Sequence, residues 1–152
     1  MHIQKEINKM KTLKPFQIFM VVALLITTAF ALTSCGPSKV DVSLTTYKIT
    51  LSTDSVKAGE VTFHVTNNAT DLVHEFVIFK TDLPEDQLPL NAENIVDEEG
   101  AGITFINEVE DVEQGTSKDL TVTLEPGRYV LICNTAEKLH YQHGMHIVFT
   151  VK

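Results

Sequence analysis

Apolar and polar residues alternate in several short stretches of the chain after residue 39. The alternation is clearest in VDVSLTTYKITLS (residues 40–52) and VTFHVTN (residues 61–67), and it is typical of strands in a sheet that buries one face. Further stretches rich in β-branched and aromatic residues also predict strands: residues 72–80, 128–134 and 146–151. About seven to eight short strands, with no long helical pattern, predict an all-β fold, a Greek-key sandwich of two sheets.

One long segment, Thr81 to Lys118, departs from this pattern. It contains two prolines and many acidic residues, so we interpret most of it as a solvated acidic flap. Within it we expect a short helix near residues 92–100 and an exposed edge strand near residues 106–115. The acidic residues lack the regular spacing and central glycine of an EF-hand loop, so the pattern does not predict a calcium site.

The first 39 residues have the pattern of an export signal. Residues 1–14 carry four lysines against one glutamate, and residues 15–34 have no charged residue. The next residue completes LTSC, which resembles the lipobox of bacterial lipoproteins, and this resemblance implies lipid attachment at Cys35. We therefore expect a signal peptide over 1–34, a lipidated tether over 35–39 and a folded domain over 40–152. An uncleaved membrane-spanning helix is the alternative, because the uncharged run is close to the roughly 20 residues that a bilayer requires.

Removal of the signal changes the charge and the sulfur inventory of the chain. It leaves 8 basic and 19 acidic residues, a net charge of −11, which argues against nucleic-acid binding and favours a basic partner. Cys133 is then the one cysteine outside the lipidation site, and Met145 is the one methionine. An exported domain thus keeps one unpaired thiol and one thioether, twelve positions apart.

Potential metal ligands crowd into YVLICNTAEKLHYQHGMH, residues 129–146. Two imidazoles, one thiolate and a weak thioether are the ligand set of electron-transfer copper sites. Cys133 lies where a predicted strand ends, and His140 and Met145 follow before the last predicted strand. The best candidate for the second imidazole is His74, because it opens a strand on the same side as Phe76 and Ile78.

The segments VTFHVTNNATDLVHEFVIFKTDLP, LTVTLEPGRYVLICN and HYQHGMHIVFTV look like the cupredoxins, the small blue copper proteins of plastocyanin and azurin type. The resemblance extends over nearly all of residues 51–152, and it implies one copper ion, cycling between Cu(I) and Cu(II), held by four ligands: His74, Cys133, His140 and axial Met145. The sequence departs from the family in two respects. NTAEKL, between Cys133 and His140, is longer than the usual loop. Glu75 stands where asparagine is common, which puts the usual hydrogen bond from that position to the sulfur in doubt. Asn134 is a candidate for pinning the loop.

Each candidate ligand also has a purely structural interpretation. Cys133 can be a buried apolar thiol, His74 a core histidine and Met145 a packing residue. His143 competes with His140, but it leaves only one residue before Met145. For His64, His143 and His146 we favour surface positions.

These features predict an exported protein of the cell envelope, periplasmic or on the outer face of a membrane, with a lipid anchor. We expect an electron carrier, not an enzyme, with no small-molecule substrate. Its expected partner is a redox protein with a basic surface, such as a cytochrome, and electrons would pass at the His140 edge, in a patch that includes Tyr141 and Met145. The alternatives are a copper carrier or storage protein, which His143 and His146 would favour, and a metal-free interaction module.

Overall fold

The computed structural model describes residues 36–136 and 139–152. The predicted signal over 1–34 and the predicted lipidation site Cys35 lie outside the described residues, so both remain predictions. Among the described residues, no helix has the length and apolar character needed to cross a membrane.

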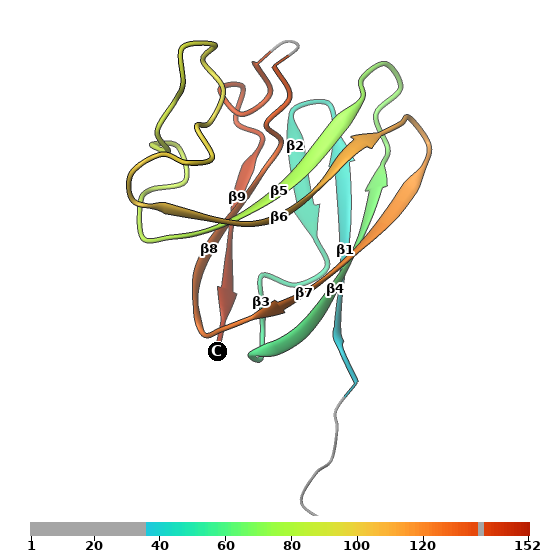
Figure 1. Cartoon of the computed structure of the whole chain (residues 1–152). Coiled ribbons are helices and arrows are strands. Elements are labelled where there is room, and N and C mark those ends of the chain that lie inside the picture. Colours follow the sequence, from blue (N-terminus) through green and yellow to red (C-terminus); the bar gives the residue numbers. More distant parts are fainter. Residues whose placement is uncertain (1–35, 137–138) are drawn as a thin grey trace, which may run out of the picture. The chain divides into compact units, whose positions relative to one another are not determined.

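Nine strands of the described chain form two sheets (Figure 1). Their bounds are β1 Ser38–Thr45, β2 Lys48–Leu51, β3 Ser55–Val56, β4 Gly59–Asn67, β5 His74–Thr81, β6 Ile103–Val112, β7 Ser117–Leu124, β8 Gly127–Ile132 and β9 His146–Val151. The order is β2-β1-β4-β7 in the four-stranded sheet and β3-β9-β8-β5-β6 in the five-stranded sheet. Pairs β1–β4 and β3–β9 are parallel, and the other pairs are antiparallel. The predicted all-β sandwich is confirmed.

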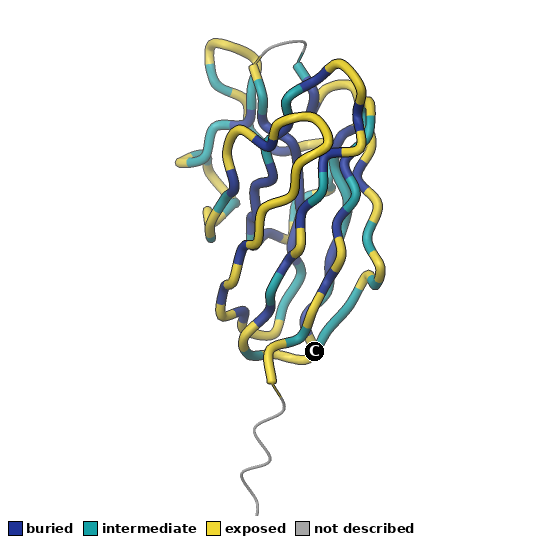
Figure 2. Tube along the Cα trace, turned by 90° about the vertical axis from the view of Figure 1, so that its right-hand side faces the viewer, coloured by how far each residue is buried: buried dark blue, intermediate teal, exposed yellow. Residues whose placement is uncertain are grey.

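The alternation in the sequence becomes an inner and an outer face in each strand. In β4, Val61, Phe63 and Val65 are fully buried, whereas His64 between them is exposed. Figure 2 shows this alternation of buried and exposed positions along the strands. The inward residues of both sheets meet in one core cluster, in which the Phe63 ring lies 5.4 Å from the rings of Phe76 and Phe149. This core positions the strand ends that carry the candidate ligands.

Strands β5 and β8 are buried on both faces, which is why they read as nearly continuous apolar runs. Alternate residues of these strands, such as Val77 and Ile132, form a second cluster on the outer side of the five-stranded sheet. Leu88 and Val96 cover it, so this part of the acidic segment is packed and not a solvated flap. The predicted helix at residues 92–100 is wrong, because turns and a Leu90–Val96 bridge occupy that place. The predicted edge strand is confirmed as β6.

The two ends of the sandwich differ in what they carry. β1 begins and β9 ends at one end, and the β8–β9 connection lies at the other (Figure 1). The eight residues of β1 correspond to about 26 Å at the usual rise per residue of a strand. The candidate ligands therefore gather at the end of the domain that is remote from Ser38.

Candidate metal centre

Three predicted ligands from separate parts of the sequence meet at one point inside the sandwich. His74 opens β5, Cys133 directly follows β8, and His140 lies in the β8–β9 connection. The Cys133 Sγ atom lies 3.6 Å from His74 Nδ1 and 3.2 Å from His140 Nδ1, and the two Nδ1 atoms are 3.2 Å apart. The exposed fractions of His74 and Cys133 are 0%, and that of His140 is 1%.

These distances fit a metal ion. A point equidistant from the three atoms lies about 2 Å from each, which is the length of a metal–imidazole bond. Packing of apolar surface does not explain this arrangement. In it, two buried imidazoles and a buried thiol face one another with the atoms that bind metals. His74 Nε2, on the far side of that ring, is buried without a hydrogen-bond partner among the described residues. The atoms that converge are Nδ1 of His74, Nδ1 of His140 and Sγ of Cys133, and these are atoms that a metal ion would bind.

The strands fix the position of the Cys133 sulfur from two directions. The backbone N–H of Glu75 donates a hydrogen bond to Cys133 Sγ at 3.3 Å, and Thr135 Oγ1 lies 3.3 Å from the same sulfur. The doubt about a hydrogen bond to the sulfur, raised by the Glu75 side chain, is thus resolved by the backbone amide of that residue. Donors to a thiolate orient it and tune its basicity.

Burial sets the protonation of the metal-free ligands. Burial, followed by the neighbouring His140 and opposed by Asp71, lowers the pKa of His74 to about 4. His74 is therefore neutral at neutral pH, as a metal ligand must be. Burial raises the pKa of the Cys133 thiol, although hydrogen bonds from Thr135 and the Glu75 amide oppose this. A metal that binds the thiolate has to displace the thiol proton, so binding must release a proton.

Met145 is fully buried and belongs to the same core cluster as Cys133. Its backbone carbonyl accepts a hydrogen bond from the Cys133 N–H at 3.0 Å, and its own N–H donates to the His140 carbonyl at 3.2 Å. The backbone of Met145 thus links Cys133 to His140 through two hydrogen bonds. Its role as axial ligand remains a prediction.

Tyr141 anchors the β8–β9 connection to the acidic segment. Its hydroxyl accepts a hydrogen bond from the Leu88 N–H and donates one to the Glu85 carbonyl, both at 2.9 Å. The expectation that Tyr141 and Met145 form an exposed patch around His140 is wrong, because Tyr141 is 6% exposed and Met145 is fully buried. Tyr141 points into the second cluster and Met145 into the main core, because burial of their apolar surface stabilises the fold.

Asn134 braces the first part of the same connection. Its Oδ1 atom accepts from the Val96 N–H at 2.8 Å, and its Nδ2 atom donates to the Val96 carbonyl and to Glu98. The predicted pinning role of Asn134 is therefore confirmed, and the anchor is the acidic segment. Together with Tyr141, it holds a connection that is longer than the family pattern.

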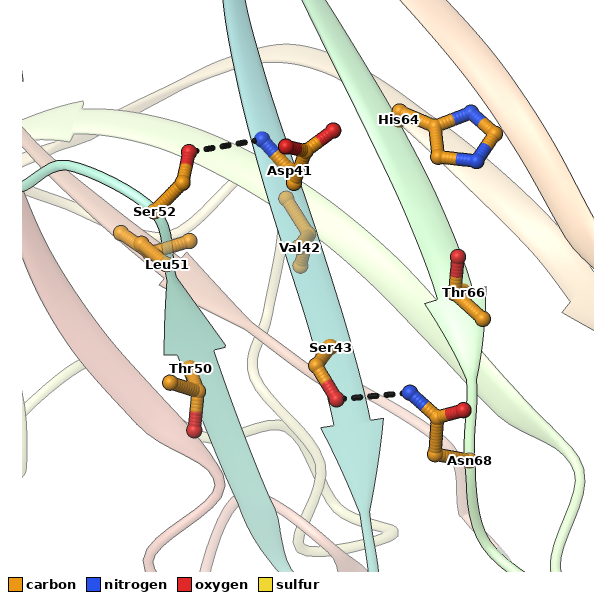
Figure 3. Close-up of a pocket in the computed structure, with 9 residues that line it drawn as sticks. All are labelled: Asp41, Val42, Ser43, Thr50, Leu51, Ser52, His64, Thr66 and Asn68. Atoms are coloured by element: carbon orange, nitrogen blue, oxygen red, sulfur yellow. Dashed lines mark hydrogen bonds between the residues drawn. The ribbon is translucent and has the colours of Figure 1, made fainter.

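The other three histidines of the described chain, His64, His143 and His146, are not among the three converging ligands. His64 is exposed on the outer face of the four-stranded sheet, in a shallow hollow (Figure 3), and its Nδ1 atom lies 2.6 Å from Asp119. His143 is exposed, as predicted. His146 is half-buried with its ring 5.4 Å from the Tyr141 ring, so its predicted surface position is only partly right.

Tyr47 is a part of the site that the sequence did not reveal. It lies in the turn between β1 and β2, and its ring meets that of His140 edge-on, with centroids 5.4 Å apart and planes at 82°. The same ring lies 4.6 Å from that of His143. Its signal in the sequence is slight, because Tyr47 lies within the alternating stretch of residues 40–52 and no turn was predicted there.

A second group of possible ligands is entirely acidic. Glu75, Glu98 and Glu108 place carboxylate oxygens within 4.8 Å of one another, and all three are half-buried. Burial, the hydrogen bond with Glu108 and the surrounding carboxylates raise the pKa of Glu75 to about 8. At neutral pH, Glu75 therefore keeps its proton and shares it with Glu108, which is a sufficient reason for the carboxylates to lie together without a cation.

Solved structures of other proteins share this fold. An auracyanin from the photosynthetic bacterium Roseiflexus castenholzii is 24% identical, with a TM-score of 0.56 over 77% of this chain and 99% of that one. Auracyanin A from Chloroflexus aurantiacus, described as a "blue" copper protein, is 19% identical, with a TM-score of 0.54 over 77% of this chain and 100% of that one. The chain has the cupredoxin fold.

Reduced rusticyanin, another cupredoxin, is 16% identical, with a TM-score of 0.54 over 88% of this chain and 95% of the other. No protein-family model matches the sequence, and neither does any curated protein. At these identities the likeness shows the cupredoxin fold alone.

Proposed function

We propose that the domain is a mononuclear blue copper protein that carries electrons. The proposal rests above all on the convergence of His74 Nδ1, His140 Nδ1 and Cys133 Sγ at distances that fit one metal ion. Copper bound there supplies one-electron chemistry by cycling between Cu(I) and Cu(II). The predicted ligands are these three side chains and, more weakly, Met145.

The surroundings of the three atoms favour copper over zinc. A catalytic zinc site keeps an open position for water, and a structural zinc site has four strong ligands. Here the fourth candidate is the thioether of Met145, in a fully buried residue of the core. Thiolate and thioether sulfur suit Cu(I), and imidazole suits both oxidation states. A site excluded from water and held by strands also limits reorganisation when the charge on the metal changes.

Burial of the ligands favours electron transfer over metal delivery. A copper donor needs ligands that an acceptor can replace one at a time, and none of the four candidates is more than 1% exposed. The exposed His143 beside the site is the feature that would support copper handling. It does not contribute to the three converging atoms, so copper handling remains the second proposal.

The charge of the domain supports docking of a basic redox partner, such as a cytochrome. Glu98 and Glu108 lie beside β5, and β6 adds Glu110 and Asp111 at its exposed edge. Complementary charge raises association rates, and salt screens this effect. We expect the association rate with a basic partner to fall as ionic strength rises from 0.01 to 0.15 M.

The predicted lipid anchor is compatible with this function. The described chain begins at the end of the sandwich opposite the ligands, so attachment at Cys35 would leave the metal end accessible to a partner. Export to the cell envelope and anchoring remain proposals. Labelling of the expressed full chain with a palmitate analogue, with Cys35→Ser as the control, tests both.

The optical spectrum of the copper-loaded protein tests the function. We expect an intense visible band from thiolate-to-Cu(II) charge transfer, bleached by a reductant and restored by an oxidant. Cys133→Ala should abolish the band, and Cys133→Ser provides the matched control of similar size. A colourless protein that retains Cu(I) alone and releases it to a chelator would favour copper handling, and no metal uptake would favour an interaction module.

A further inference from the structure

The hairpin between β1 and β2 places one aromatic ring against the loop side of the metal centre. Tyr47 is half-buried, and its ring contacts those of His140 and His143, as described above. The two histidines differ in exposure: His140 is 1% exposed, whereas His143 is at the surface. Tyr47 therefore lies at the boundary between a buried ligand and solvent.

The backbone of Tyr47 is unusual for a tyrosine. Its φ angle is +56°, in the left-handed region that glycine adopts without strain. A residue with a side chain costs roughly 1–2 kcal/mol in that conformation. Glycine would therefore make the same turn at lower cost, so the turn itself does not explain the tyrosine. The contacts of its ring with His140 and His143 explain the tyrosine.

The other ligands do not depend on such a contact. His74 and Cys133 lie at strand ends of the five-stranded sheet, and the Glu75 amide connects the two. His140 lies in the β8–β9 connection, among the turns that the structure describes from residue 139 to 144, next to Leu139, which also has a positive φ of 48°. An edge-on aromatic pair stabilises by about 0.5–1.5 kcal/mol beyond burial, enough to bias the orientation of one imidazole.

We propose that Tyr47 is a positioning residue that covers His140, excludes solvent and external ligands from this edge of the centre, and holds the imidazole toward Cys133. His143 packs against the outer side of the same ring and keeps it in place. The identity of the metal comes from the proposed function, but the cover itself is a property of the chain without metal.

Chemical modification of the metal-free protein tests the cover. Diethyl pyrocarbonate acylates accessible imidazoles, and mass spectrometry of the peptides gives a separate rate for each histidine. We compare the unaltered chain with Tyr47→Phe, which keeps the ring, and with Tyr47→Gly, which removes it and relieves the positive φ. His140 should react about tenfold faster in Tyr47→Gly than in the other two proteins, the scale set by the loss of one aromatic pair.

Two histidines serve as internal references in the same samples. His64, exposed on the remote sheet face, should react at one rate in all three proteins. His74, fully buried at a strand end, should stay slow in all three. Equal His140 rates in Tyr47→Gly and the unaltered chain would overturn the proposal. A parallel rise at His74 would also overturn it, because the whole domain would then open.

A second measurement uses the copper-loaded protein. Tyr47→Gly should lose copper to a Cu(I) chelator about tenfold faster than Tyr47→Phe, while its visible band keeps the same position, because no ligand has changed. Equal rates of loss would contradict the cover. Failure of the proposed function is distinguishable, because a protein without a blue band still gives the modification rates of His140.

Discussion

The two halves of the candidate centre are built in different ways. His74 and Cys133 lie at the ends of β5 and β8, which are paired strands in the interior of the five-stranded sheet. His140 and Met145 lie in the connection from β8 to β9, and side chains from elsewhere hold that connection. One half is positioned by a sheet and the other by individual contacts.

The difference shows what each kind of support provides. The antiparallel pairing of β5 and β8, from Val77–Ile132 to Lys80–Tyr129, brings the adjoining residues His74 and Cys133 together at one end of the two strands. The connection is held by individual contacts, among them those of Tyr141, Asn134, Tyr47 and the backbone of Met145. We therefore expect substitutions in the strand half to disturb the fold and the site together, and substitutions in the loop half to be partly separable.

Removal of one imidazole from each half is the strongest way to break the comparison. His140→Gly and His74→Gly should each lower copper affinity more than about 100-fold, because loss of a ligand exceeds loss of a residue that only orients one. Added imidazole should restore the visible band in His140→Gly, because loss of the His140 ring removes one of the two rings that Tyr47 packs against, so the cover can open. It should not do so in His74→Gly, where the sheet and core enclose the space. Equal rescue of both variants would contradict the distinction.

Removal of the Tyr141 hydroxyl tests the anchor of the loop half. Tyr141→Phe leaves the buried Leu88 N–H without its acceptor, so the free energy of unfolding should fall by about 1–3 kcal/mol in urea. Tyr129→Phe is the matched control, because the Tyr129 hydroxyl only donates to the Glu125 carbonyl. Its loss should cost about 1 kcal/mol or less. An equal loss in the free energy of unfolding for Tyr141→Phe and Tyr129→Phe would contradict the anchoring role of the Tyr141 hydroxyl.

Replacement of Met145 sharpens the assignment of the fourth ligand. Met145→Leu keeps the buried volume but replaces a donor atom with an apolar side chain, and this costs the more highly charged Cu(II) more than it costs Cu(I). We expect copper to stay bound and the reduction potential to rise on the order of 60 mV, a tenfold change in relative affinity. Cyclic voltammetry measures the shift, and an unchanged potential would remove Met145 from the ligand set.

The smallest expected effect concerns Glu98, which accepts a hydrogen bond from the Asn134 brace of the β8–β9 connection. Burial raises the pKa of Glu98, as do Glu108, Glu110 and Asp97, although its hydrogen bond with Asn134 opposes the rise. A carboxyl with a raised folded-state pKa destabilises the fold above its unfolded pKa, and this penalty disappears as it is protonated. Glu98→Gln should therefore stabilise the metal-free domain slightly at pH 7, and not near pH 4, because solvent screens much of the charge effect on this partly exposed carboxyl.

Unfolding of the same variant at both pH values measures this. The exposed neighbour Glu99 provides the control substitution Glu99→Gln, which should change stability less at pH 7. A gain for Glu98→Gln that is equal at both pH values would contradict the role of its charge.

The strand half of the molecule was predictable from the sequence. Alternation in residues such as Val61, Phe63 and Val65 predicts which face is buried, and His74 continues such a pattern at the start of β5. The order and close spacing of Cys133, His140 and Met145 also predicted metal ligands from the sequence. These predictions depend on local periodicity and on ligand chemistry, both of which are visible in a single sequence.

The loop half was less predictable, for a physical reason. The inward direction of Tyr141 depends on Leu88 and Glu85, more than fifty residues earlier, and no local pattern connects them. The predicted helix at residues 92–100 failed because Asn134 and the second core cluster impose turns there. The role of Tyr47 arises from the approach of two connections at one end of the sandwich, which only the fold reveals.

The most direct test of the central claim is X-ray absorption at the copper edge of the loaded protein. We predict a first shell of two nitrogen atoms at about 2 Å and one thiolate sulfur at a slightly longer distance. Such a shell would match His74, His140 and Cys133. A shell of oxygen atoms without sulfur would place the metal at Glu75, Glu98 and Glu108 instead, and would contradict the account.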